Sequence, residues 1–265
     1  MEVHHHPHVD PDNHRHKNFK EYFLEFVMIF LAVTLGFFAE SYREHLSDNS
    51  REKEYMKEIV ANLKYDTERC NRNYKLNVFG ASGIDTLRNE IKKAINGKAD
   101  VNKMYYFTFL YARESNQAAF NTTAISELKS SGSLRLISNE KLIEQLADYY
   151  ERKIFAAKSY LPDDKEIRNK EDEVFSMLNM DNYIFSFNNM DTTTYNNNYN
   201  FKNILTLTPA LKLITNNPKE MEKLYNDVTS FELSIKRYNL WLSICKKAAT
   251  ELIAEIQKEY NLEND

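Results

Sequence analysis

The sequence predicts an all-α protein, with an N-terminal transmembrane helix followed by an elongated antiparallel helical bundle. Three observations support this prediction: one strongly apolar run near the N-terminus, few turn residues, and a long regular series of apolar residues near the C-terminus. The 265 residues include only 5 Gly and 5 Pro. So few chain-breaking residues are typical of long helices.

The apolar run extends from Tyr22 to Ala39. At ~1.5 Å rise per residue, a helix of this length reaches roughly 27 Å, just enough to cross the hydrocarbon core of a bilayer. It passes directly into the polar stretch at Glu40 without a small-residue cleavage site, which favours a retained anchor over a removed signal peptide. Glu25 inside the run favours the alternative of a buried helix in a soluble core. We expect a transmembrane helix over residues 19–45.

A histidine-rich head precedes this helix. Six of the 7 histidines lie within the first 16 residues, which also contain two prolines. Because this stretch has no apolar periodicity, we expect residues 1–18 to be flexible. Dense imidazoles can bind Zn, Cu or Ni. A polar head that contacts lipid headgroups and an expression tag are the alternatives, and we assign no metal ligand and no cofactor.

Residues 46–260 are expected to form the helical bundle. Asp48–Ser50 predict a helix start, with Glu52 completing a capping box, although the first helix could also continue unbroken from the membrane. Residues spaced alternately by four and three then predict a helix packed on another helix. They are Met56, Val60, Leu63, Thr67, Cys70 and Tyr74.

Glycines predict the end of this helix at Gly80 and Gly83. Residues 84–95 then predict a short amphipathic helix that Asn96–Gly97 close. Further helices are expected over residues 104–111 and 124–130.

The middle of the chain predicts one more capped helix and an irregular connection. Ser138–Asn139 are expected to cap a helix that Pro162 kinks and that resumes toward Leu178. Residues 181–203 contain eight Asn and six aromatic residues without a helical period. We therefore expect an irregular connection there.

The last helix has the clearest pattern. Asn217 and Pro218 occupy its N-cap and first position, and its predicted length of ~40 residues corresponds to roughly 60 Å. The segment after the span is its expected antiparallel partner, and residues 261–265 are expected to form a tail. The apolar series consists of Met221, Leu224, Val228, Phe231, Ile235, Tyr238, Leu242, Cys245, Ala249, Leu252 and Ile256.

The only cysteines, Cys70 and Cys245, lie at core positions of these two long helices. Two cysteines are too few for a disulfide framework and lack the spacing of a zinc site. We expect both to be buried free thiols, with a disulfide between them as the alternative.

The stretch from Phe120 to Tyr150 resembles the central signature of an uncharacterised bacterial family of single-span membrane proteins. Members of that family begin with a span that continues into an Arg/Glu-rich helix, as residues 31–63 do here. The resemblance covers most of the first 150 residues and implies a membrane-anchored helical domain, but no activity. Physically, the stretch predicts a corner between two helices, with Gly132 in the left-handed turn and Leu134, Leu136 and Ile137 in the core.

Composition and motifs restrict the function. Net charge is −4 with the two signs mixed, so nucleic-acid binding has no support. No histidine follows His45, which excludes a Ser–His enzyme within the domain but leaves a carboxylate- or lysine-based site open. We predict a non-enzymatic protein, a scaffold or a sensory or accessory subunit that acts through protein contacts. The alternative is a ligand-binding or enzymatic site in the aromatic-rich bundle.

The expected partners are the lipid bilayer and another protein or a second copy. Glu25, Ala32 and Gly36 lie on one face of the span, and Ala32 and Gly36 form a pair that permits close helix packing. We expect a single-pass protein of a bacterial inner membrane. Basic residues on the two sides of the span are nearly balanced, and we favour a cytoplasmic N-terminus with the domain in the periplasm.

Overall fold

The computed structural model describes residues 18–112, 117–161, 169–170, 172–173, 176–179 and 212–262. Within these ranges the secondary structure is helical, except for one isolated antiparallel bridge between Leu178 and Leu213. The predicted all-α class is therefore confirmed. Two compact units make up the chain, Met1–Lys53 and Glu54–Asp265.

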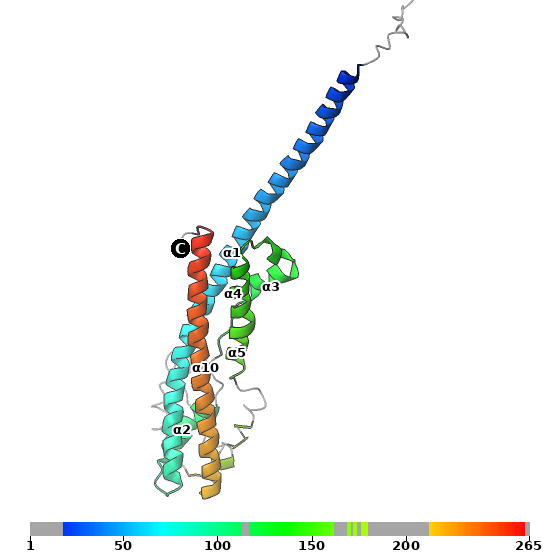
Figure 1. Cartoon of the computed structure of the whole chain (residues 1–265). Coiled ribbons are helices and arrows are strands. Elements are labelled where there is room, and N and C mark those ends of the chain that lie inside the picture. Colours follow the sequence, from blue (N-terminus) through cyan, green and yellow to red (C-terminus); the bar gives the residue numbers. More distant parts are fainter. Residues whose placement is uncertain are drawn as a thin grey trace, which may run out of the picture. The chain divides into compact units, whose positions relative to one another are not determined.

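Helix α1 is a single helix of 76 residues, Phe19–Ala94 (Figure 1). The helix passes unbroken through Asp48–Ser50, which agrees with the alternative of one continuous first helix, whereas the predicted end at Gly80 and Gly83 is wrong. A glycine inside a helix costs only about 0.5–1 kcal/mol. The next turns bury Ile84, Leu87 and Ile91 completely or almost so, and this packing outweighs the cost of the glycines.

The end of α1 is where the sequence predicts a helix end. Gly97 adopts φ 67°, and its N–H donates to Ala94 O at 2.9 Å. The left-handed turn at Gly97 confirms the Asn96–Gly97 C-cap. Helix α2, Val101–Ala112, follows after Asp100, whose carboxylate accepts the Lys103 N–H at 3.1 Å. The predicted helix over 104–111 is confirmed.

The predicted corner consists of α3 (Thr123–Ser130), a 3-10 turn η1 (Ser133–Leu136) and α4 (Glu140–Ala147). Gly132 has φ 69°, as its place in the turn requires. The Asn139 side chain accepts the Leu142 N–H at 3.2 Å and so caps α4. Ile137 is buried, whereas Leu134 and Leu136 are only half-buried, because the tight 3-10 turn directs Ser133 inward instead.

Helix α4 continues into a π-helical turn η2, Asp148–Lys153, and then into α5, Ile154–Lys158. Residues 169–170, 172–173 and 176–177 are helical, which agrees with the predicted helix toward Leu178, and Leu178 itself lies in the isolated bridge. The histidine-rich head up to residue 17, Pro162 and the connection 181–203 lie outside the described residues.

Helix α10, Pro218–Glu259, confirms the clearest prediction. Asn217 accepts the Lys219 N–H at 3.0 Å, and Pro218 occupies the first position, where no N–H is needed. All eleven residues of the predicted apolar series are buried.

Helix α10 packs antiparallel to the part of α1 that belongs to the second unit, and α4, η2 and α5 lie beside them (Figure 1). Lys246 Nζ donates to Asn71 Oδ1 at 3.1 Å, and Asn239 Nδ2 donates to Tyr74 O at 3.5 Å. Arg88 pairs with Glu232 at 3.3 Å. Residue numbers rise along α1 as they fall along α10, which confirms the predicted pairing.

The buried face of α1 differs from the predicted one in two places. Thr67 is half-buried and Tyr74 is 41% exposed. Polar side chains occupy the buried positions instead, namely Asp66, Asn73 and Asn77. An apolar pattern does not identify buried polar residues. It therefore placed the neighbouring Thr67 and Tyr74 on the buried face.

Two glycine substitutions test the continuity of α1 at Gly80 and the left-handed turn at Gly132. An added Cβ at Gly80 meets nothing within 4 Å, so Gly80→Ala should stabilise the protein by about 0.5–1 kcal/mol in denaturant unfolding. Gly132→Ala should destabilise it by about 1 kcal/mol or more, because alanine is strained at φ 69°. A loss of stability in Gly80→Ala would contradict the unbroken helix.

Candidate functional site

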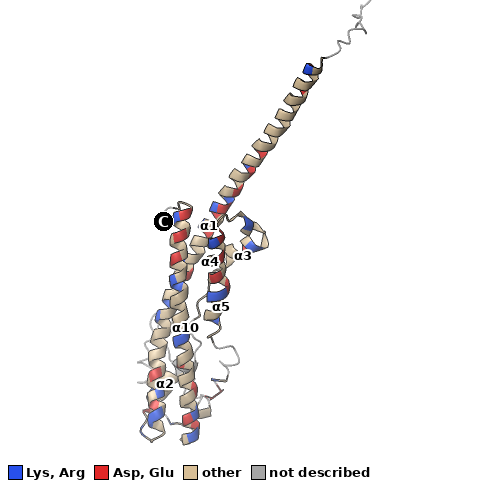
Figure 2. Ribbon diagram, in the orientation of Figure 1, with Lys and Arg blue, Asp and Glu red and all other residues tan. Residues whose placement is uncertain are grey.

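The first unit presents an apolar surface. Within the described residues, α1 is the one helix long and apolar enough to cross a membrane. No residue of its most apolar 18-residue stretch is buried. Its apolar side chains are largely exposed, for example 71% of Phe37 and 68% of Val33. In Figure 2 this part of α1 is mostly free of charged residues. Such a surface is costly in water and suited to lipid.

The three residues predicted to mediate association lie on this surface. Ala32 and Gly36 are exposed, and Glu25 is half-buried. An added Cβ at Gly36 meets nothing within 4 Å, so the helix backbone there is open to close approach. Helical spacing places the three residues on one face of α1.

The second unit contains a buried polar centre around Asp66 of α1. Asp66 has no exposed surface, and its carboxylate accepts the Asn121 N–H at 2.7 Å and the Tyr149 hydroxyl at 2.8 Å. Nearby, the Tyr238 hydroxyl accepts the Ala118 N–H at 2.7 Å. The two bonds to Asp66 join α1 to the segment before α3 and to the π-helical turn.

Burial governs the protonation of this centre. Desolvation raises the pKa of Asp66 to about 6, although the bonds from Asn121 and Tyr149 act in the opposite direction. Burial, with the nearby Asp66 charge second, also raises the pKa of the Tyr149 and Tyr150 hydroxyls. The rings of these two tyrosines pack edge to face at 4.9 Å. Burial therefore shifts the protonation equilibrium of each of these groups toward its neutral form.

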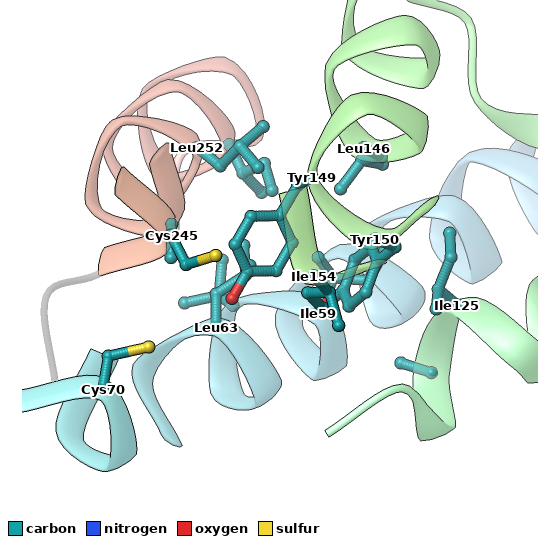
Figure 3. Packing of buried hydrophobic residues seen from close by; sticks show 14 of the residues in the cluster. Ile59, Leu63, Cys70, Ile125, Leu146, Tyr149, Tyr150, Ile154, Cys245 and Leu252 are labelled. Atoms are coloured by element: carbon teal, nitrogen blue, oxygen red, sulfur yellow. The ribbon is translucent and has the colours of Figure 1, made fainter. Parts of the chain in front are cut away.

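The two cysteines belong to the same core (Figure 3). Both are free and buried, as predicted. Burial, with lesser contributions from neighbouring acidic groups, raises the pKa of Cys70 and of Cys245 to about 12. Because the thiolate is the reactive form, both thiols should be inert in the native protein.

A shallow hollow of about 570 Å³ runs between α1 and α10 on their outer side. Tyr74 and Val78 of α1 and Leu240 of α10 contribute half-exposed or exposed apolar side chains. Lys236 and Glu232, which pair with each other, line it as well. The apolar side chains in this hollow form an exposed apolar surface along the contact between α1 and α10.

A second hollow of about 520 Å³ is lined by charged residues of both signs. Lys223 pairs with Glu173 at 2.7 Å and with Asp227 at 3.5 Å. Desolvation, with Asp227 next in weight, raises the pKa of Glu173. The sequence leaves a carboxylate- or lysine-based enzyme site open, and this described cluster has the residue types that such a site would need. Its charges compensate one another, and such ion pairs are common structural features.

The Asp66 centre was not found from sequence, although one signal exists. Asp66 lies three residues after Leu63 and four before Cys70, and both of these are buried. A carboxylate at such a position indicates a buried polar contact. Its partners lie 55 and 83 residues away in sequence, and no local pattern identifies them.

Comparisons with family models, with curated proteins and with solved structures give no match for this chain. The resemblance to an uncharacterised single-span family therefore stays a prediction. Among the residues the structure describes, no group of three or more His, Cys, Asp or Glu is placed to hold a metal ion.

Thiol labelling tests the core assignment of the cysteines. In the folded protein at pH 8, a maleimide reagent should leave Cys70 and Cys245 unmodified, because both are buried and almost fully protonated. After denaturation, both should react without prior reduction. Thr250→Cys, at an exposed position of α10, supplies a fast-reacting control. Rapid native labelling of Cys245 would place it outside the core.

Proposed function

We propose that this chain is a non-enzymatic, single-pass protein of a bacterial inner membrane whose helical domain acts through protein contacts, as a scaffold or as a sensory or accessory subunit. One observation carries the proposal: the apolar stretch of α1 has no buried residue. A helix that forms part of a soluble core would cover this stretch.

The polar interior of the second unit supports a non-enzymatic role. The Asp66 centre is closed from solvent and its hydrogen bonds hold helices together. The thiols are protonated and buried. The aromatic residues Tyr149 and Tyr238 are core side chains with bonded hydroxyls. The described exposed apolar surfaces, by contrast, are of the kind that packs against lipid or another protein.

Purification of the full chain from membranes in a mild detergent tests the proposal. We expect a stable protein complex of defined stoichiometry, made of further copies or of another protein. A co-purifying small molecule without a protein partner would favour the ligand-binding alternative. A chain that washes off membranes at alkaline pH would contradict the anchor itself.

The orientation of the span is a further part of the proposal. Three basic residues precede the apolar run, Arg15, Lys17 and Lys20, and a comparable but more dispersed set follows it, beginning with Arg43 and Arg51. The positive-inside difference is therefore small. We propose a cytoplasmic N-terminus and a periplasmic domain.

Reporter fusions at the C-terminus check this orientation. A reporter active only in the periplasm should be active there, and one active only in the cytoplasm should be silent. The same pair of reporters fused ahead of Phe19 should give the opposite pattern. Cytoplasmic activity at the C-terminus would invert the proposed topology.

Self-association through the span is part of the proposal. Small residues at Ala32 and Gly36 permit close approach of two helices, and the absence of side-chain neighbours at Gly36 leaves that face open. Glu25 on the same face is costly against lipid, and a second copy can supply a polar partner.

Crosslinking in native membranes measures this association. Gly36→Ile adds a branched side chain at the contact and should shift a crosslinked dimer toward monomer. Glu25→Leu should act in the same direction. Thr34→Ile places the same isoleucine side chain on the opposite face and should leave the dimer unchanged. If neither Gly36→Ile nor Glu25→Leu alters the crosslinks, the span is only an anchor.

A further inference from the structure

We propose that Asp66 is a proton-controlled latch: its carboxyl joins α1 to the segment before α3 and to the π-helical turn η2, and its proton determines how firmly these elements are held.

The latch is defined by two hydrogen bonds that meet at one carboxyl group. Asn121 N–H and the Tyr149 hydroxyl donate to different oxygens of Asp66, at 2.7 and 2.8 Å. Asn121 in turn accepts the Thr123 N–H with its own side chain at 3.1 Å. Thr123 is the first residue of α3, so the bond between Asp66 and Asn121 lies just before the start of that helix.

Among the described residues, no lysine or arginine pairs with the Asp66 carboxyl. Asp85, Glu90, Asp227 and Glu232 on the long helices each have such a partner. The titratable groups that face it are Cys70 on α1, Tyr149 and Tyr150 on η2 and Cys245 on α10. Lys246 and Lys153 act on the thiols. An ionised Asp66 therefore places an uncompensated charge in the core.

Protonation changes the hydrogen bonds without breaking the centre. The carboxylate can only accept, so the Tyr149 hydroxyl must donate to it. A protonated Asp66 can itself donate to the Tyr149 oxygen, while its other oxygen still accepts Asn121 N–H. The centre keeps both contacts and loses the cost of a buried charge.

Two further buried donors lie on the elements that the latch joins. Asn62 Nδ2, one helical turn before Asp66, and the Tyr150 hydroxyl are buried without a hydrogen-bond partner among the described residues. Both can donate to a carboxylate, and an unsatisfied buried donor is itself costly. Tyr150 also belongs to the π-helical turn, a type of helical irregularity that is frequent at functional sites. The bonds from Asn121 and Tyr149 favour the ionised form, so it is the cost of the buried charge, and not a loss of these bonds, that weakens the latch on ionisation.

The direction of the pH effect follows from the pKa of Asp66, which burial raises from 3.8 to about 6. The folded protein binds this proton more tightly than the unfolded chain, so stability falls as pH rises between these two values and stays low above them. The stabilisation is complete below the lower value. Acidification from pH 7.5 to pH 5 should favour the folded state by about tenfold in the unfolding equilibrium constant.

The test uses the full chain in detergent micelles. We expect denaturant unfolding at pH 5 and 7.5 to show this tenfold difference, and amides of residues 117–122 to exchange more slowly at pH 5 after correction for intrinsic rates. Asp66→Asn, neutral at both pH values, should abolish the Asp66 part of the difference. Glu58→Gln removes an exposed carboxyl of α1 and should retain it.

A second variant keeps the proposal testable if Asp66→Asn does not fold. Tyr149→Phe removes one donor to the carboxylate, so it should raise the pKa of Asp66 further and move the pH transition upward. The proposal is overturned if Asp66→Asn keeps the wild-type pH dependence. It is equally overturned if Tyr149→Phe leaves the pH of the transition unchanged.

Discussion

The antiparallel contact between α10 and the second part of α1 is the constraint on which the rest of the domain depends. These are the two longest helices, and both apolar clusters of the core contain residues from each of them. Helices α3 and α4 have 8 residues each, and helices this short are not stable alone in water. They form because the long pair offers an apolar surface to pack against, with Leu128 and Leu142 fully buried on it.

Polar contacts inside this pairing determine its register. Apolar residues repeated every three or four positions allow several offsets between two long helices. Buried Glu232 pairs with Arg88, and Asn239 donates to the Tyr74 carbonyl. A shift by one helical turn would leave these groups buried without partners, which costs more than the apolar contacts regain. The polar residues therefore select one arrangement among several of similar apolar burial.

The sequence predicts those features that depend on local chemistry. The Asn217 cap, the left-handed Gly97 and Gly132 and the apolar series of α10 follow from short-range rules, and the structure confirms them. The end of α1 was misplaced because tertiary packing outweighs the small cost of Gly80 inside a helix. The bonding partners of Asp66 could not be predicted, because they lie 55 and 83 residues away in sequence.

The chemistry of the interior bears on where a function can reside. Burial raises the pKa of both thiols and of Tyr238 to about 12, so none of these groups is a nucleophile or base near neutral pH. Asp66 is the exception, since its pKa of about 6 lies within the physiological range. Within the described part of the chain, its carboxylate accepts the Asn121 N–H and the Tyr149 hydroxyl and has no exposed surface. A group so placed responds to pH through the bonds that it accepts from Asn121 and Tyr149, and so acts on the helical elements that carry these donors.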